Sequence, residues 1–232
     1  MQSIDVSGTM DKKKIWVYAA DTSVLSDDRA FWEGYQQVSR RRQEKIDRFL
    51  FRKDKELSLG AELLLKRCLQ IHGIAAYQIQ YGEHRKPYLK ECTGIDGRKA
   101  EETLYFNLSH SGQRVMCVIS HVEAGCDVEK VKEIDMKVAK HFFVTEEYER
   151  VAAQETEDKR QEMFFRIWTL KESLMKATGL GMTLAPESFQ VDVEHGNGEY
   201  HFKEYDPLDG YKYAVCGKTE DFAEEICFLK LL

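Results

Sequence analysis

The sequence lacks three features that would place it outside the reduced interior of a cell. None of its 6 cysteines forms a Cys-x-x-Cys pair, and their spacing is irregular, so we expect free thiols rather than disulfides or a zinc site. No apolar run is long enough to span a membrane. The stretch up to Lys14 is polar and lacks the apolar region of a secretory signal. We therefore expect a cytoplasmic protein with no membrane partner.

The chain also lacks an excess of positive charge. Its 34 Lys and Arg are outnumbered by 40 Asp and Glu, which gives a formal net charge of -6, so the overall charge does not indicate a nucleic-acid binder. One region departs from this balance, because residues 40–56 carry a local charge of +4. This region is either a solvated helix face or an anion-binding patch.

The length and the order of predicted elements indicate two halves. At 232 residues the chain is long enough to bury a substantial core. Mixed strands and helices occur on both sides of residue 122, so we predict an α+β fold of two similar halves, 1–122 and 123–232, each with an antiparallel sheet packed by helices. A site at the junction would draw residues from both halves.

Local patterns predict the positions of these elements. Strands are predicted at 15–20, 77–80, 88–89, 104–108, 115–119, 125–129, 189–193, 200–205, 211–215 and 226–229. Helices are predicted at 39–49, 60–72 and 135–143, from 145 onward, and over 164–176. The charged residues 155–162 are predicted to form a mobile connection, and residues 107–112 a tight polar loop.

The segment 164–176 is the most informative part of the sequence. An apolar stripe at helical spacing predicts that one side of this helix faces a core: Met163, Ile167, Leu170 and Leu174. Trp168, Glu172 and Lys176 are spaced i, i+4, i+8 and share another face, with Lys171 beside them. Alone, such a Lys-Glu pair is more often an exposed surface ion pair.

Two further carboxylates lie on the strand predicted at 125–129. Asp127 and Glu129 occupy alternate positions and therefore project to the same face. Neighbouring carboxylates repel each other unless a cation lies between them, and Mg²⁺ binds carboxylates together with water and phosphate oxygens. Glu172 would supply a third ligand. An isolated Asp-x-Glu pair is more often part of a solvated strand face.

Two upstream segments carry residues suited to phosphate. The Asn-Leu-Ser-His-Ser-Gly segment places His110 between two serines, where it is either a structural histidine or an anion ligand. Lys86 and Pro87 place a cation against a rigid proline.

These motifs, in this order, resemble the Sfp-type 4′-phosphopantetheinyl transferase family. The signature Gly-x-Asp-x-Glu strand corresponds to residues 125–129, and the Trp-x-x-Lys-Glu-Ser-x-x-Lys helix to residues 168–176. The Phe-Asn-Leu-Ser-His-Ser segment at 106–111 and the Lys86-Pro87 pair precede them. The resemblance covers most of the chain and implies the pseudo-duplicated fold of that family.

The resemblance also implies a reaction and its residues. The 4′-phosphopantetheine of coenzyme A would be transferred to a serine of an apo acyl or peptidyl carrier protein, with Mg²⁺, and 3′,5′-ADP would be released. The carrier and its pathway, whether fatty-acid, polyketide or nonribosomal-peptide synthesis, stay open. The implied metal ligands are Asp127, Glu129 and Glu172, and the implied catalytic residues are Glu172 as base, Lys176 at the departing phosphate, and His110. The implied coenzyme A contacts are Arg42, Lys45, Lys86, Pro87, Ser109, His110, Lys171 and Lys176.

Two positions depart from the family pattern. Glu56 stands where the family often has an arginine, so Arg52, Lys53 or Lys55 would have to replace its contact with the 3′-phosphate. Arg85 stands where a glycine usually precedes the Lys-Pro pair. An acidic carrier would dock on an apolar patch with basic edges, for which the candidates are Lys137, Lys140, Phe142, Phe143 and Met182.

Two other classes of function stay open from the residues alone. A Mg²⁺-dependent nuclease or phosphohydrolase would also combine acidic residues with lysine. A non-catalytic protein that binds coenzyme A or a carrier would keep the basic patch but need no metal ligands. A structural metal site, or none, is the third alternative. Because one chain holds both halves, we expect a monomer.

Overall fold

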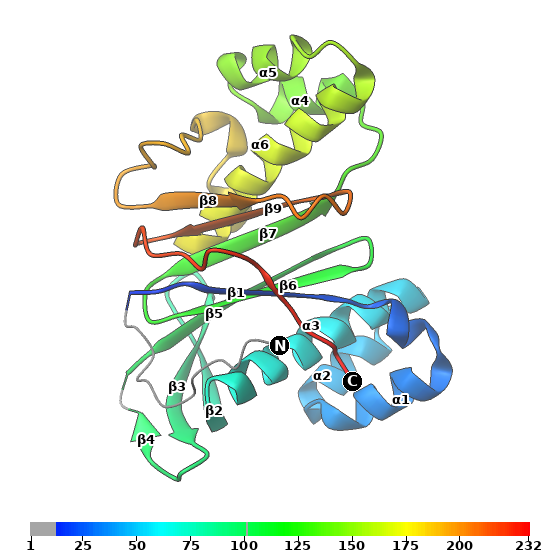
Figure 1. Cartoon of the computed structure of the whole chain (residues 1–232), viewed down its shortest axis with the longest axis vertical. Helices are drawn as coiled ribbons and strands as arrows, with labels where there is room; N and C mark the ends of the chain where they lie inside the picture. The colour runs from blue at the N-terminus through cyan, green and yellow to red at the C-terminus, as the bar shows by residue number, and fades with distance from the viewer. Residues whose placement is uncertain (1–12, 101) are drawn as a thin grey trace.

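The computed structural model describes residues 13–100 and 102–232 of the chain. The structure has four layers: two β-sheets face each other at the centre, and helices cover their outer sides (Figure 1). The predicted α+β class is therefore confirmed. Residues 1–12, which belong to the stretch examined for a secretory signal, lie outside the described part.

The first sheet is antiparallel apart from one strand pair. Its strand order is β10-β1-β6-β5-β3-β2, with the short strand β4 beside β3. Its strands are β1 (Trp16–Asp21), β2 (Ile74–Tyr81), β3 (Pro87–Gly94), β4 (Lys99–Ala100), β5 (Leu104–Ser111), β6 (Arg114–Ser120) and β10 (Cys227–Phe228). The strand predicted at 226–229 thus joins the first sheet, parallel to β1.

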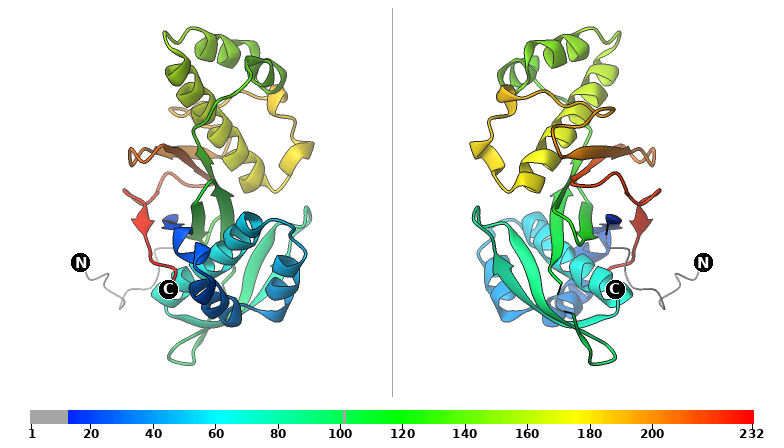
Figure 2. Two further views of the ribbon diagram at one scale, coloured as in Figure 1. Left: turned by 90° about the vertical axis from the view of Figure 1, so that its right-hand side faces the viewer. Right: turned by 90° about the vertical axis from the view of Figure 1, so that its left-hand side faces the viewer.

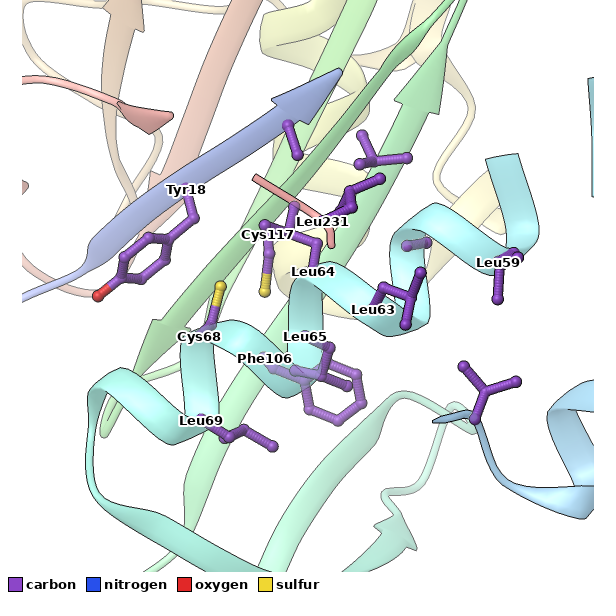
Figure 3. Close-up of a cluster of buried hydrophobic side chains, with 14 of the residues drawn as sticks. Tyr18, Leu59, Leu63, Leu64, Leu65, Cys68, Leu69, Phe106, Cys117 and Leu231 are labelled. Carbon is purple, nitrogen blue, oxygen red and sulfur yellow. The ribbon is translucent and has the colours of Figure 1, made fainter. Parts of the chain in front are cut away.

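Helices cover the outer face of this sheet. They are the 3-10 turn η1 (Ser23–Ser26), α1 (Asp28–Gln37), α2 (Arg40–Asp47) and α3 (Arg52–Ile71). The helix predicted at 60–72 begins eight residues earlier, at Arg52. Its apolar face packs on β1, β5 and β6, with Leu64 and Cys68 facing Cys117 in the close-up (Figure 3). Leu231, near the chain's C-terminal end, lies in the same core.

The second sheet has three antiparallel strands in the order β7-β9-β8. They are β7 (Ala124–Lys130), β8 (His201–Tyr205) and β9 (Tyr211–Gly217). Its helices are α4 (Met136–Phe142), α5 (Thr145–Ala152) and α6 (Glu157–Thr178), followed by the 3-10 turns η2 (Gly181–Thr183) and η3 (Pro186–Ser188). The long helix α6 crosses this sheet on the side away from the first sheet (Figures 1 and 2).

Two predictions of local structure are wrong here. Residues 157–162 are not a mobile connection but the first turns of α6, because the Thr156 side chain caps the helix and acidic residues occupy its first turn. Residues 189–193 form no strand. Their backbone groups bond to buried side chains instead, since Val191 N donates to Glu147 and Phe189 O accepts from Lys171.

Candidate active site

A glycine brings β7 into direct contact with α6. A Cβ on Gly125 would lie 2.3 Å from Ala177 N and 2.3 Å from Ser173 O, so only glycine allows this approach. The close packing places the middle of β7 beside the last turns of α6. The glycine of the Gly-x-Asp-x-Glu motif therefore has a packing role, which brings Asp127 next to Lys176.

A cluster of polar side chains forms at this contact. Lys176 Nζ lies 2.6 Å from Asp127 Oδ1 and 3.7 Å from Glu172 Oε2. Ser109 Oγ donates to the same Asp127 oxygen at 2.6 Å and accepts from Lys176 Nζ at 3.1 Å. Asp127 is buried, with 2% of its surface exposed. The cluster thus joins β5, β7 and α6, as expected for a site at the junction of the halves.

The local charges shift several pKa values. Burial raises the pKa of Glu172, and Asp127 raises it further, although Lys176 opposes them. The pKa of Glu129 is likewise raised by burial and by Asp127, against the hydrogen bond from Ser111. Burial alone would lower the pKa of Lys176, but Asp127 and Glu172 outweigh this and raise it. Lys176 is therefore an ammonium ion held among carboxylates.

The Asn-Leu-Ser-His-Ser segment belongs to a strand, not to the loop predicted at 107–112. It continues β5 as far as Ser111, and the turn to β6 begins at Gly112, whose φ is 60°. Ser109 and Ser111 face β7, where Ser111 Oγ donates to Glu129 Oε2 at 2.6 Å. The alternation of polar residues along 107–111 is the strand signal that the loop prediction overlooked.

His110 lies on the opposite face of β5 from Ser109 and Ser111. Burial of the ring lowers its pKa, and the ammonium groups of Lys176 and Lys45 lower it further. The imidazole is therefore neutral at pH 7. Lys45 of α2 and Lys176 of α6, although far apart in the sequence, thus both influence the charge of one histidine.

A basic cavity of about 430 Å³ lies between α2 and β2. Arg41, Arg42, Lys45 and Arg48 contribute four cations to its lining, and Glu44 and Glu62 contribute two carboxylates. Arg42 is not free, because its guanidinium lies 2.9 Å from the buried Glu62. Several of the basic residues that give segment 40–56 its positive charge therefore line a cavity.

Lys86 and Pro87 lie at the other side of the junction. Lys86 Nζ donates to the backbone oxygens of Ala124 at 2.8 Å and Ala177 at 2.5 Å, which ties β7 to the end of α6. Burial lowers the pKa of Lys86 to about 8. Both residues line a second cavity of about 490 Å³, together with Tyr88, Tyr105 and Thr178.

Comparison with known proteins identifies the family. Residues 27–122 match the family model for the 4′-phosphopantetheinyl transferase N-terminal part, and residues 123–226 match that of the 4′-phosphopantetheinyl transferase superfamily. The 4′-phosphopantetheinyl transferase Sfp of Bacillus subtilis (strain 168) is 30% identical over 203 residues, which are 82% of this chain and 86% of that protein. The 4′-phosphopantetheinyl transferase gsp of Aneurinibacillus migulanus is 32% identical over 191 residues, 77% and 76% of the two chains.

The chain belongs to the 4′-phosphopantetheinyl transferase superfamily. A solved holo-[acyl-carrier-protein] synthase from Thermotoga maritima is 19% identical, with a TM-score of 0.34 over 41% of this chain and 62% of that chain. The sequence relatives from Bacillus subtilis and Aneurinibacillus migulanus confirm the family resemblance inferred from the motifs, and the protein is a phosphopantetheinyl transferase.

Lys171 of this transferase does not reach the Lys176 face. Its side chain is fully buried and lies 2.7 Å from Glu147, and its ammonium group also donates to the backbone oxygens of Pro186 and Phe189. The expectation that Lys171 contacts phosphates is therefore wrong. A helix places residue 171 about 100° away from residue 172, so the lysine points into the core rather than alongside Glu172.

The two departures from the family pattern now have structural contexts. Glu56 pairs with Arg52 at 3.0 Å, and Arg52 also lies 3.0 Å from Asp28, so this arginine is occupied by two carboxylates. Arg85 has φ of 58°, in the left-handed region. A glycine adopts that conformation without steric cost, which gives a physical reason for the usual residue.

The candidate docking residues divide into exposed and buried groups. Met182 is 62% exposed, and Lys137 and Lys140 are exposed on α4. Phe143 is buried and stacks on Phe164, so it is a core residue rather than a docking residue. Phe142 is half-buried and packs edge-on against Trp168, which connects α4 to α6.

Three carboxylates of the transferase are the metal ligands that the resemblance implies: Asp127, Glu129 and Glu172. Among the described residues, no three His, Cys, Asp or Glu side chains are arranged to hold a metal ion. Asp127 Oδ2 is nevertheless buried without a hydrogen-bond partner. Asp127 also raises the pKa of both Glu129 and Glu172. An orphaned carboxylate oxygen among mutually repelling carboxylates fits a hard cation.

Proposed function

We propose that this protein transfers the 4′-phosphopantetheine of coenzyme A to a serine hydroxyl of an apo acyl or peptidyl carrier protein. In this reaction the serine oxygen forms a bond to the phosphorus next to pantetheine. The bond from that phosphorus to the bridging oxygen breaks, and 3′,5′-ADP leaves. Family membership supports the reaction type, since relatives that cover most of the chain carry the name 4′-phosphopantetheinyl transferase.

The observation that carries the proposal is the cluster of Asp127, Glu172 and Lys176 at the junction of the halves. Phosphoryl transfer is catalysed mainly by alignment and by stabilisation of charge on phosphate oxygens. Here an ammonium group and two carboxylates meet on a rigid strand and helix. The arrangement supplies a base and a cation within one small site.

We assign the base to Glu172 and the cation at the leaving group to Lys176. The pKa of Glu172 is raised by burial, which makes its carboxylate a better proton acceptor than an exposed one. Glu172 would take the serine proton directly or through a water molecule. Lys176 would stabilise the phosphate of the departing 3′,5′-ADP or donate a proton to it. Its ion pair with Asp127 holds it in place for either role.

Coenzyme A would bind along the side of the junction that carries His110, Lys45 and Arg42. The basic cavity between α2 and β2 suits the 3′-phosphate, and the neutral His110 is within the electrostatic influence of both Lys45 and Lys176. Lys86 and Pro87 would border the nucleotide. Because the Lys86 ammonium binds two backbone oxygens, we expect its main contribution to be the shape of this border. Ser109 would be reached only from the cluster side, because it is buried.

We further propose that Asp127, Glu129 and Glu172 hold Mg²⁺ in the working enzyme. The buried, unpartnered Asp127 Oδ2 supports this, because a hard cation would satisfy it. When bound, Mg²⁺ would neutralise charge on the pyrophosphate oxygens. Incubation with a chelator should abolish transfer, and added Mg²⁺ should restore it. Transfer that persists in chelator would overturn this part of the proposal.

The carrier would dock beside α4 and η2, where Lys137, Lys140 and Met182 are exposed. An acidic carrier fits basic side chains around an apolar residue. We expect Met182→Glu to raise the KM for the carrier without changing the KM for coenzyme A. Leu208→Glu, at an exposed apolar position in the turn between β8 and β9, is the matched control.

We propose that the enzyme works as a monomer in the cytoplasm. Both halves of the chain contribute residues to the cluster, so a second copy of the chain is not needed to complete it. No helix within the described residues is both long and apolar enough to cross the membrane. A net charge of -6 also gives no reason to expect a nucleic-acid partner.

The deciding experiment measures the intact mass of an apo carrier protein after incubation with the enzyme, coenzyme A and Mg²⁺. The wild type should add one phosphopantetheine moiety, and Glu172→Gln should add it at least about 100-fold more slowly. A protein that binds coenzyme A but modifies none of several carriers would instead be a binding module. Release of phosphate without an acceptor protein would support a phosphohydrolase.

A further inference from the structure

Strands β5 and β7 belong to different sheets, yet side chains join them in a regular ladder. Three alternate residues of β5 accept hydrogen bonds from backbone N–H groups of β7. Asn107 Oδ1 accepts from Cys126 N at 3.0 Å. Ser109 Oγ accepts from Val128 N at 3.4 Å. Each pair is separated by 19 residues, so the two strands keep one register.

The third rung is made by Ser111. Its Oγ accepts from Lys130 N at 3.2 Å, again 19 residues away. Backbone groups of β7 on this side are thus satisfied by an amide and two hydroxyls, where a neighbouring strand would offer carbonyl oxygens. The ladder holds β7 against β5 through side chains.

The two serines of the ladder each make a second hydrogen bond. Ser109 Oγ lies 2.6 Å from Asp127 Oδ1, and Ser111 Oγ lies 2.6 Å from Glu129 Oε2. A hydroxyl has one hydrogen to donate. Because each oxygen already accepts a backbone N–H, its hydrogen is directed at the carboxylate. The same atom therefore locks a β7 backbone position and the orientation of the acidic side chain next to it.

From this geometry we infer that Ser111 is a positioning residue, which orients Glu129 for metal binding through the Ser111–Glu129 hydrogen bond. This inference rests on the Mg²⁺ site of the proposed function. Ser111 is the sharper test of the two serines, because Ser109 also contacts Lys176. Among the described residues, Ser111 is the hydrogen-bond donor to the Glu129 carboxylate. Groups that orient metal ligands typically change metal affinity by about 10- to 100-fold when they are removed.

The test measures Mn²⁺ binding to the full chain in the presence of 3′,5′-ADP, by titration calorimetry, for the wild type and three variants. Ser111→Ala should weaken Mn²⁺ binding at least about 10-fold. Ser111→Thr, which keeps the hydroxyl, should stay within about 3-fold of the wild type. In steady-state assays Ser111→Ala should raise the metal concentration needed for half-maximal rate, with little change in the KM for coenzyme A.

Ser120→Ala is the matched control. Ser120 Oγ also accepts a backbone N–H, from Val122 at 3.1 Å, and donates to Lys14 O at 3.1 Å, but it contacts no carboxylate among residues 13–100 and 102–232. It should change the thermal midpoint without changing Mn²⁺ affinity. If Ser111→Ala does not fold, Ser111→Cys, which has a weaker donor in a similar shape, takes its place.

Two results would overturn the inference in distinguishable ways. Equal Mn²⁺ affinity for wild type and Ser111→Ala would show that the hydroxyl does not orient the ligand, although the metal site exists. A wild type that binds no Mn²⁺ would refute the metal site itself, and the inference with it. Carrier modification by mass would still decide the transferase reaction separately.

Discussion

The ammonium nitrogen of Lys176 lies 2.6 Å from Asp127 Oδ1, and this ion pair joins the last turns of α6 to the middle of β7. Lys176→Ala removes the cation that we place at the leaving phosphate. The kcat should fall at least about 100-fold, while the KM for coenzyme A changes little. Single-turnover transfer to a carrier measures this directly. Lys176→Arg, which keeps the charge, should retain more activity, and equal rates for Ala and wild type would contradict the assignment.

Gly125→Ala tests the contact that forms the site. Its Cβ would lie 2.3 Å from two backbone atoms of α6, so strand and helix would have to separate. We expect a loss of at least about 2 kcal/mol in the free energy of unfolding, measured in urea. Gly82→Ala is the control, because a Cβ there meets nothing nearer than 3.7 Å. Similar unfolding midpoints for the two variants would show that β7 and α6 can move apart at little cost in stability.

Much of this site follows from short-range patterns. The apolar stripe of α6 and the alternation of Asp127 and Glu129 both depend on the period of a regular element. Each pattern predicts which residues share one face of the helix or strand. In the structure the polar face of α6 meets the carboxylate face of β7. The resemblance implies that Ser109 contacts coenzyme A. In the structure its hydroxyl also binds Asp127, a partner 18 residues away whose position depends on how the two sheets meet.

Other features depend on tertiary contacts that no local pattern encodes. The segment 189–193 has strand-like composition, but its backbone groups are taken by Glu147 and Lys171. The strand at 227–228 pairs with β1 more than 200 residues earlier in the sequence. The prediction for Lys171 is wrong because a lysine next to Glu172 in the sequence is expected to be exposed. In the structure it is buried, where the buried carboxylate of Glu147 on α5 pairs with it.

The buried pair of Lys171 and Glu147 should be costly to break from one side. Glu147→Ala would leave a lysine without its counter-ion in a site with no exposed surface. We expect a loss of about 3–5 kcal/mol in the free energy of unfolding, by urea titration. Replacing both, as Lys171→Met with Glu147→Leu, should recover only part of that loss, because Val191 N and Phe189 O would lose their side-chain partners. A single variant as stable as the double variant would show that the lysine sheds its charge or finds water.

Lys45→Ala tests the basic cavity between α2 and β2. The KM for coenzyme A should rise about 10-fold with kcat almost unchanged, because Lys45 supplies binding rather than chemistry. Arg42→Ala should also raise the KM but lower stability, since it leaves Glu62 buried without a partner. Lys99→Ala is an exposed control outside the cavity lining. A rise for Lys99→Ala as large as that for Lys45→Ala would indicate only general electrostatic attraction.

His72 should make the fold less stable in mild acid. Its Nε2 lies 2.7 Å from Tyr18 Oη, and burial lowers its pKa from 6.5 to about 4. The unfolded chain therefore binds a proton more readily, so this contribution to stability is complete above pH 6.5 and is lost as the pH falls toward 4. Between pH 7.5 and pH 5 the wild type should lose about 2 kcal/mol through this group. Glutamine does not titrate, so the free energy of unfolding of His72→Gln, measured by urea titration, should fall by about 2 kcal/mol less than that of the wild type between these pH values. Equal losses of unfolding free energy for the two proteins would show that folding does not lower the pKa of the imidazole.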